Sequence, residues 1–164
     1  MTTAMAGRTV AIGQTRGMDV VATLDAACTP AVLMAVVRDL DRYPEWLSIL
    51  PRTERVDGVE PATWSVELRA TIGPLARSKR LRMTRTIDEG DHVRFERSEV
   101  DGRSHSAWVL DGRVDAEGGG SRLTMTLHYG GALGGGIVER LLRDEIEDSR
   151  ARLRAVVEAG PVGP

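Results

Sequence analysis

The amino-acid sequence predicts an α+β protein in which a curved, seven-stranded antiparallel sheet wraps around one long C-terminal helix. Apolar residues recur at helical spacing over residues 137–159, after a glycine-rich run and before Gly160 and Pro161. Over residues 53–129, apolar and polar residues instead alternate with a period of two, as in an antiparallel sheet with one wet face. A single long helix must bury its apolar side against a broad surface, and the curved sheet is the expected partner.

The first strand is expected over residues 19–27, and two short helices should follow it. Thr29 and Pro30 are typical of an N-cap and a first helical residue. The first helix would therefore run to about residue 39. A second short helix is expected over residues 44–50, between two prolines.

Six further strands are expected from the alternating pattern. They are placed at residues 53–58, 64–72, 80–87, 93–99, 106–114 and 123–129. Glycine-containing turns separate most of them, among them Asp101-Gly102 and the triple glycine at 118–120. The predicted order is strand, two short helices, six strands and one long helix.

Composition indicates one globular domain over residues 17–160, with residues 1–16 as a flexible N-terminal tail. The formal net charge of −2 argues against general attraction to nucleic acid or to an anionic membrane. Cys28 is the only cysteine, so no internal disulfide is possible and a reducing compartment is indicated. No apolar run reaches the length of a membrane helix, and a cytoplasmic location is expected.

The element order, together with Tyr43-Pro44-Glu45-Trp46-Leu47, resembles the START-like helix-grip superfamily, also called SRPBCC. This superfamily includes the polyketide cyclase/dehydrase, coenzyme Q-binding and birch-pollen-allergen-like families. Its motif of an aspartate, a spacer and Tyr-Pro-x-Trp corresponds here to Asp39 or Asp41 followed by residues 43–46. The resemblance covers about residues 18–160. It implies a helix-grip fold with a hydrophobic-ligand cavity between sheet and helix, and the motif packs the second helix rather than performing catalysis.

The large side chains predicted to face inward are the candidates for lining such a cavity. They are Trp46, Leu50, Trp64, Leu68, Met83, Phe95, Trp108, Met125, Tyr129 and Leu142. Plain core packing is the alternative for each of them. A wide cavity is favoured for the group, because one helix does not easily fill a strongly curved sheet.

Three polar residues, Arg85, Arg97 and Glu145, are predicted on the same inner face and are further candidate ligand contacts. Arg85 stands at two-residue spacing from Ile87, which is also expected to face inward. A buried charge is costly, so these groups should pair with one another, reach water or meet a polar ligand group. Glu145 or Glu99 is the expected acidic partner of Arg85. A β-bulge would reverse the facing of any strand.

Other motifs do not indicate chemistry. The three histidines, His92, His105 and His128, are predicted on solvent faces and lack metal-ligand spacing. The basic run at residues 77–85 has no interleaved aromatic residues on which bases could stack, so it predicts a solvated strand face. The glycine-rich run at 130–136 lacks the Gly-Lys-Ser/Thr ending of a phosphate-binding loop. No catalytic residue, metal or cofactor is therefore assigned.

The favoured function is binding of a hydrophobic small molecule, lipid-like, polyketide or aromatic, by a carrier or sensor. A polyketide cyclase or dehydratase is the second hypothesis, in which Arg85, Arg97, Tyr129 or Glu145 would orient a poly-keto chain and assist proton transfer. A protein-interaction module of the coenzyme Q-binding type is the third. The sequence shows no nucleophile–base pair, so binding without catalysis is preferred. No nucleic-acid partner is expected, and a homodimer is left open.

Overall fold

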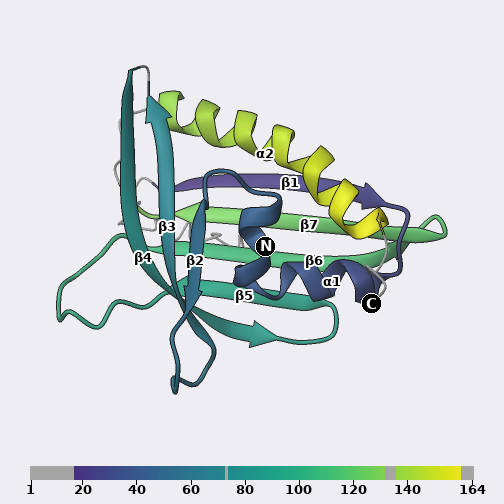
Figure 1. The fold of residues 1–164 in the computed structure, drawn as a ribbon, viewed down its shortest axis with the longest axis horizontal. Coiled ribbons are helices and arrows are strands. Elements are labelled where there is room, and N and C mark those ends of the chain that lie inside the picture. Colours follow the sequence, from purple (N-terminus) through teal and green to yellow (C-terminus); the bar gives the residue numbers. More distant parts are fainter. Residues whose placement is uncertain (1–16, 73, 132–135, 160–164) are drawn as a thin grey trace, which may run out of the picture.

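The curved seven-stranded sheet carries helix α2 across its concave face in the computed structural model, which describes residues 17–72, 74–131 and 136–159 (Figure 1). The elements are β1 (Met18–Ala26), α1 (Pro30–Val37), the 3₁₀ helix η1 (Leu40–Glu45), β2 (Arg52–Arg55), β3 (Thr63–Ile72), β4 (Leu75–Asp88), β5 (His92–Arg97), β6 (Trp108–Glu117), β7 (Gly120–Tyr129) and α2 (Gly136–Glu158). The predicted α+β class and helix-grip architecture are confirmed. The predicted tail at residues 1–16 lies outside the described residues.

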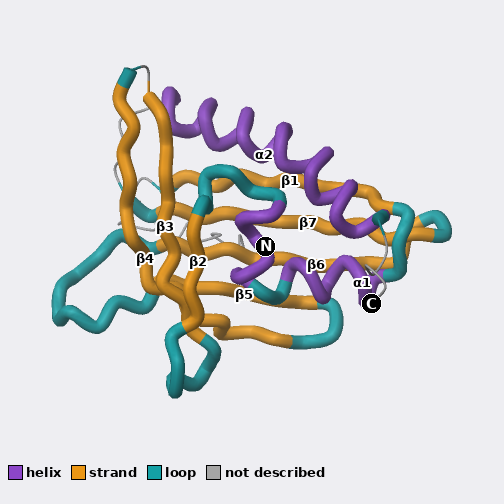
Figure 2. Tube along the Cα trace, in the orientation of Figure 1, coloured by secondary structure: helices purple, strands orange, loops and turns teal. Residues whose placement is uncertain are grey.

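The strands follow the order β1-β7-β6-β5-β4-β3-β2, and every neighbouring pair is antiparallel. Each strand pairs with its neighbour in the sequence except β1, which pairs with β7 at the far end of the meander. Opposite residues such as Leu24 and Leu123 therefore share the inner face. Figure 2 shows this single sheet with all three helices on one side of it. No helix within the described residues is long and apolar enough to cross a membrane.

Helix α1 begins as the sequence predicts and packs directly on the sheet. Thr29 caps it, with the side-chain oxygen accepting from the backbone N–H of Val32 at 3.4 Å, and Pro30 takes the first turn. Gly112 of β6 lies beneath the helix, where an added Cβ would meet Cγ1 of Val37 at 3.2 Å. The glycine thus allows the close approach of helix and strand.

The second short helix begins earlier than predicted. The carboxylate of Asp39 accepts from the backbone N–H of Asp41 at 3.0 Å, so η1 starts immediately after α1 rather than at residue 44. Residues three apart share a side of a 3₁₀ helix. Leu40, Tyr43 and the capping Trp46 are accordingly all buried.

A β-bulge in β4 changes the facing that simple alternation predicts. Arg85 lies opposite Phe95, but Ile87 lies opposite Arg94, so the register shifts between the two positions. Ile87 is thereby placed with the outward-facing Arg94, and Asp88 turns towards Arg85. The prediction that Ile87 faces inward was wrong.

Helix α1 packs against β6 and β7, whereas η1 lies beside β2 and places Tyr43 against Phe95 of β5. Phe95 is completely buried there, with its ring edge-on to Trp64 at 5.7 Å and to Tyr43 at 6.2 Å. Within the described part of the chain, cavities lie beneath α2, towards the β3–β4 hairpin, and beside α1, where the lining residues include Met34, Arg38 and Arg85.

Candidate ligand-binding site

A cavity of about 80 Å³, called here the inner chamber, lies beneath α2 against β1, β7 and β6. Its walls are almost entirely apolar. The sheet and helix side chains that line it include Val20, Ala22, Leu24, Leu110, Leu123, Met125, Leu127, Leu142, Ile146 and Leu153. Trp46, Leu47 and Ile49 close it on the side of η1. Such a surface favours an apolar ligand.

Two hydroxyls that line the inner chamber are bonded within the protein, whereas the buried indole Nε1 of Trp46 has no hydrogen-bond partner among the described residues. The Tyr43 hydroxyl donates to the carbonyl of Val37 at 2.8 Å, and burial, with a smaller contribution from Asp39, raises the pKa of Tyr43 above its ordinary value. The Ser149 hydroxyl donates to the carbonyl of Ile146 at 2.7 Å. Neither hydroxyl therefore has its proton directed at a bound molecule.

A wider cavity of about 590 Å³, the outer chamber, is lined by residues of the β3–β4 hairpin and of the first half of α2. Figure 1 shows these two elements next to each other. Trp108 and Tyr129 form one wall, with their rings 4.6 Å apart. Its polar lining residues are Ser48, Arg69, Thr71, Arg77, Ser78, Lys79 and Glu145. Ile49 and Leu142 line both chambers, so the two spaces adjoin.

Glu145 fastens α2 to the segment between η1 and β2. Its Oε1 accepts from the backbone N–H of Ser48 at 2.9 Å and from the Ser48 hydroxyl. The same oxygen accepts from Nη2 of Arg152 at 2.8 Å. Glu145 thus lines the outer chamber, as predicted for a ligand contact, while its carboxylate is engaged by the protein.

We expect Glu145→Ala to lower the free energy of unfolding by about 1–2 kcal/mol, because it removes hydrogen bonds to a charged group that is mostly shielded from water. Urea denaturation followed by circular dichroism measures the change. Glu147→Ala is the matched control on the same helix, since its exposed pair with Arg150 should contribute less than about 0.5 kcal/mol. Equal losses in the two variants would contradict the anchoring role.

The structure brings together about half of the residues predicted as ligand contacts. Those that line a chamber are Trp46, Leu68, Trp108, Met125, Tyr129, Leu142 and Glu145. Leu50, Trp64, Met83 and Phe95 face inward but pack into the hydrophobic core. Strand alternation identifies the inner face, but it does not show which part of that face α1 and η1 cover.

Arg85 lies beside α1, away from both chambers. Its Nη1 donates to the carbonyl of Arg38 at 2.8 Å, and its Nη2 pairs with Asp88 at 3.1 Å. The prediction that Glu145 or Glu99 would be its partner was wrong. The bulge after Arg85 brings Asp88 within reach, and a bulge leaves little signal in the sequence.

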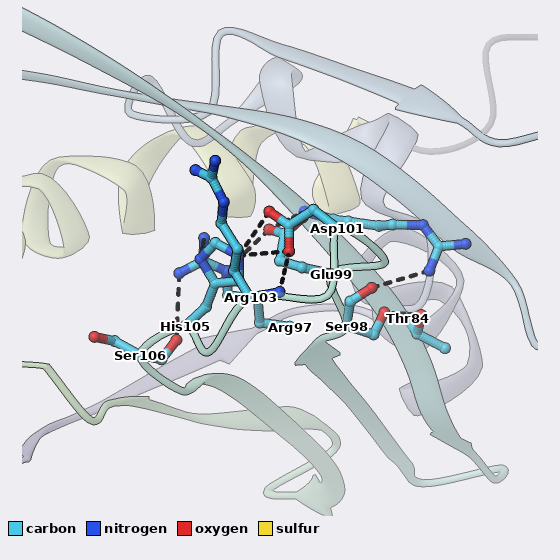
Figure 3. Close-up of polar contacts among 9 residues, drawn as sticks. Thr84, Arg97, Ser98, Glu99, Asp101, Arg103, His105 and Ser106 are labelled. Atoms are coloured by element: carbon cyan, nitrogen blue, oxygen red, sulfur yellow. Dashed lines mark hydrogen bonds and ion pairs between the residues drawn. The ribbon is translucent and has the colours of Figure 1, made fainter.

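Arg97 is enclosed by a polar network on the segment after β5 (Figure 3). Its Nε donates to Glu99 at 2.9 Å, its Nη1 to the carbonyl of Ser106 at 3.3 Å and its Nη2 to Nδ1 of His105 at 3.2 Å. Because arginine only donates, Nδ1 of His105 accepts, and Nε2–H points to Asp101 at 2.9 Å. Arg97 therefore holds this segment in place, and its side chain is only 6% exposed.

The three histidines all have acidic partners. His128 pairs with Asp19 at 2.6 Å, and its side chain is 40% exposed, in agreement with the predicted solvent-facing position. His92 bonds to Asp111 at 2.7 Å and is buried, so its predicted solvent-facing position was wrong. Among the described residues there is no group of three or more side chains that could hold a metal ion.

Two sets of lining residues are not among the predicted ligand contacts. Leu110 lies on the same strand face as Trp108, and Leu127 lies on the same strand face as Tyr129. The prediction favours the largest inward side chains and therefore does not include these two leucines. Arg77 and Lys79 line the outer chamber, although the basic run predicts a solvated strand face. Their spacing of two from Leu81 was the available signal.

Comparisons with known proteins agree with this architecture. The model of the family described as polyketide cyclase / dehydrase and lipid transport matches residues 18–158. A comparison with curated protein sequences gives no match.

Solved structures that resemble the chain include TTHA0849 from Thermus thermophilus, with 19% identity over 88% of this chain and 99% of that one, at a TM-score of 0.66. The Zhui aromatase/cyclase from Streptomyces sp. R1128 has 12% identity over 89% and 99%, at a TM-score of 0.65. A START superfamily protein from Mycobacterium smegmatis has 17% identity over 86% and 97%, also at 0.65. At such identities these likenesses establish the fold.

Proposed function

The chain belongs to the polyketide cyclase / dehydrase and lipid transport family, and on that premise we propose that it binds a hydrophobic small molecule in its two chambers as a carrier or sensor. The observation that carries this proposal is the chemistry of the inner chamber. Its walls are apolar, and the hydroxyls of Tyr43 and Ser149 donate to backbone carbonyls. A ligand placed there would exchange water for apolar contact, which is favourable by about 25 cal/mol per Å².

The positions of the polar residues favour a ligand carrier or sensor over a polyketide cyclase. A general acid or base must lie within hydrogen-bond reach of the substrate atom that it serves. Arg85 and Arg97 lie away from the chambers and bond to the protein, while Glu145 is held by Ser48 and Arg152. Of the four groups suggested for a cyclase, this leaves the Tyr129 phenol, so binding is the better-supported function.

We expect Ala22→Phe to weaken binding of the neutral hydrophobic dye Nile red by at least about tenfold, because the new ring would occupy the small inner chamber. Dye fluorescence titrated with protein measures the dissociation constant. Val21→Phe is the matched control: it is the adjacent residue of β1, it is 59% exposed, and its side chain points to the other face. That variant should bind the dye within about twofold of the unmodified protein.

Circular dichroism and thermal denaturation establish that each variant is folded. Ala22→Leu, a smaller enlargement, should give an intermediate loss if the filled volume is what matters. Unchanged dye binding in folded Ala22→Phe would contradict the assignment of the inner chamber as the binding site. Failure of the unmodified protein to bind the dye saturably would defeat the proposed function itself.

A further inference from the structure

We infer that the ligand is an amphiphile with an anionic head group, carboxylate or phosphate, which Arg77 and Lys79 of β4 bind in the outer chamber. The inference rests on the proposed function, because the head group is located relative to an apolar portion in the inner chamber. It adds the chemical class of the ligand and its direction in the site.

The two cations share one face of the hairpin. Arg77 lies opposite Ala70 and Lys79 lies opposite Leu68, and all four residues line the outer chamber. Residues two apart on a strand point to the same side. Arg77 and Lys79 therefore lie on the same face of the hairpin as Ala70 and Leu68, at the outer chamber.

The charges of Arg77 and Lys79 are not compensated within the described part of the protein. Two other charged residues of the outer chamber, Arg69 and Glu145, are each in an ion pair, at 3.0 Å and 2.8 Å. Neither the Arg77 nor the Lys79 side chain has a hydrogen bond or an ion pair to any other described residue. These two positive charges are thus available to a ligand next to the apolar surfaces of the outer chamber.

The two chambers meet at Ile49 and Leu142, so one ligand can extend from the inner chamber into the outer chamber. The apolar inner chamber cannot solvate a charge, so the charged end must stay in the outer chamber. A guanidinium offers paired donors to carboxylate or phosphate, and an ammonium adds a point charge. Both side chains are exposed, so an anionic head could contact them while keeping part of its hydration.

Displacement of Nile red by decanoate, 1-decanol and decyl phosphate tests the inference, since the three probes share one tail and differ in the head. In the double variant Arg77→Gln, Lys79→Gln, we expect decanoate or decyl phosphate to bind about tenfold more weakly, at roughly two- to fivefold for each exposed ion pair. The affinity for 1-decanol should change by less than about twofold. The loss for the anion should shrink in about 0.5 M salt, where screening shortens electrostatic reach to a few ångströms.

Arg80→Gln is the matched control, because Arg80 directly follows Lys79 in β4 but lies on the outer face, opposite Glu67. It removes one positive charge from the same hairpin and should leave the binding of all three probes within about twofold. A similar loss of anion binding in this control would overturn the inference in favour of general surface charge.

The possible outcomes distinguish a failure of the head-group inference from a failure of the proposed binding of a hydrophobic small molecule. If the double variant loses 1-decanol as strongly as the anions, or loses neither, the head-group inference is overturned while apolar binding stands. If the unmodified protein binds neither Nile red nor 1-decanol, the proposed function and the inference both fail. A greater dependence of decyl phosphate on the two cations would identify a phosphate head, and the reverse would identify a carboxylate.

Discussion

Phe95→Ala is expected to lower the free energy of unfolding by about 3–5 kcal/mol, the range for deleting a large aromatic side chain from a packed core. Phe95 is fully buried, and its ring is edge-on to Trp64 and Tyr43. The deletion would leave a cavity between β5, Trp64 of β3 and Tyr43 of η1, which these large rings cannot refill. Urea denaturation followed by circular dichroism measures the loss, and a loss below about 1 kcal/mol would contradict this account of the core.

The milder variant Phe95→Leu tests whether Phe95 belongs to the hydrophobic core alone or also contributes to the binding site. Since Phe95 lines neither chamber, we expect this folded variant to bind Nile red within about twofold of the unmodified protein. Trp108→Leu is the comparison, because Trp108 lines the outer chamber and its loss should weaken dye binding by several-fold. If the two variants lose equal affinity, Phe95 acts on the site after all.

Arg97→Met should lower the free energy of unfolding by about 2–4 kcal/mol, because it removes one partner of a largely buried ion pair. Glu99 is only 19% exposed and would lose its cation, and the carbonyl of Ser106 would lose a donor. The segment between β5 and β6 would also lose the bond from Arg97 to His105. Chemical denaturation measures the cost.

Two further variants keep the explanation for Arg97 testable. Arg103→Met removes an exposed arginine of the same segment and should cost less than about 0.5 kcal/mol. A double-mutant cycle with Glu99→Gln should give a coupling energy of at least about 1 kcal/mol. Strict additivity of the two changes would show that the ion pair is not the source of the loss.

The fold was predictable because its signals are local and repeated. Helix α2 was expected over residues 137–159 and is found at Gly136–Glu158, since an amphipathic repeat of that length has one good solution. The N-cap at Thr29 was equally predictable from the sequence. The start of η1 was not, because it depends on one hydrogen bond to Asp39 rather than on the conspicuous proline.

The site was predictable only in part, because facing inward is not the same as facing the ligand. Trp64 and Trp108 both face inward and both belong to the hydrophobic core, yet only Trp108 of the two also lines the outer chamber. The difference comes from where α1 and η1 lie, which is a tertiary property. The partner of Arg85 was missed for a related reason, since a bulge of one residue selects Asp88.

The pairing of β1 with β7 also sets the order in which the chain can fold. The β3–β4 hairpin pairs residues that are close in sequence. The β1–β7 pairing instead joins Ala26 to Ser121 and Met18 to Tyr129, which are far apart in sequence. Contacts between residues so distant in sequence form late, because the intervening chain must first be brought to order. During synthesis on the ribosome, Val20 and Leu24 would therefore remain uncovered until β7 and α2 had emerged, and the inner chamber would be among the last parts to be completed.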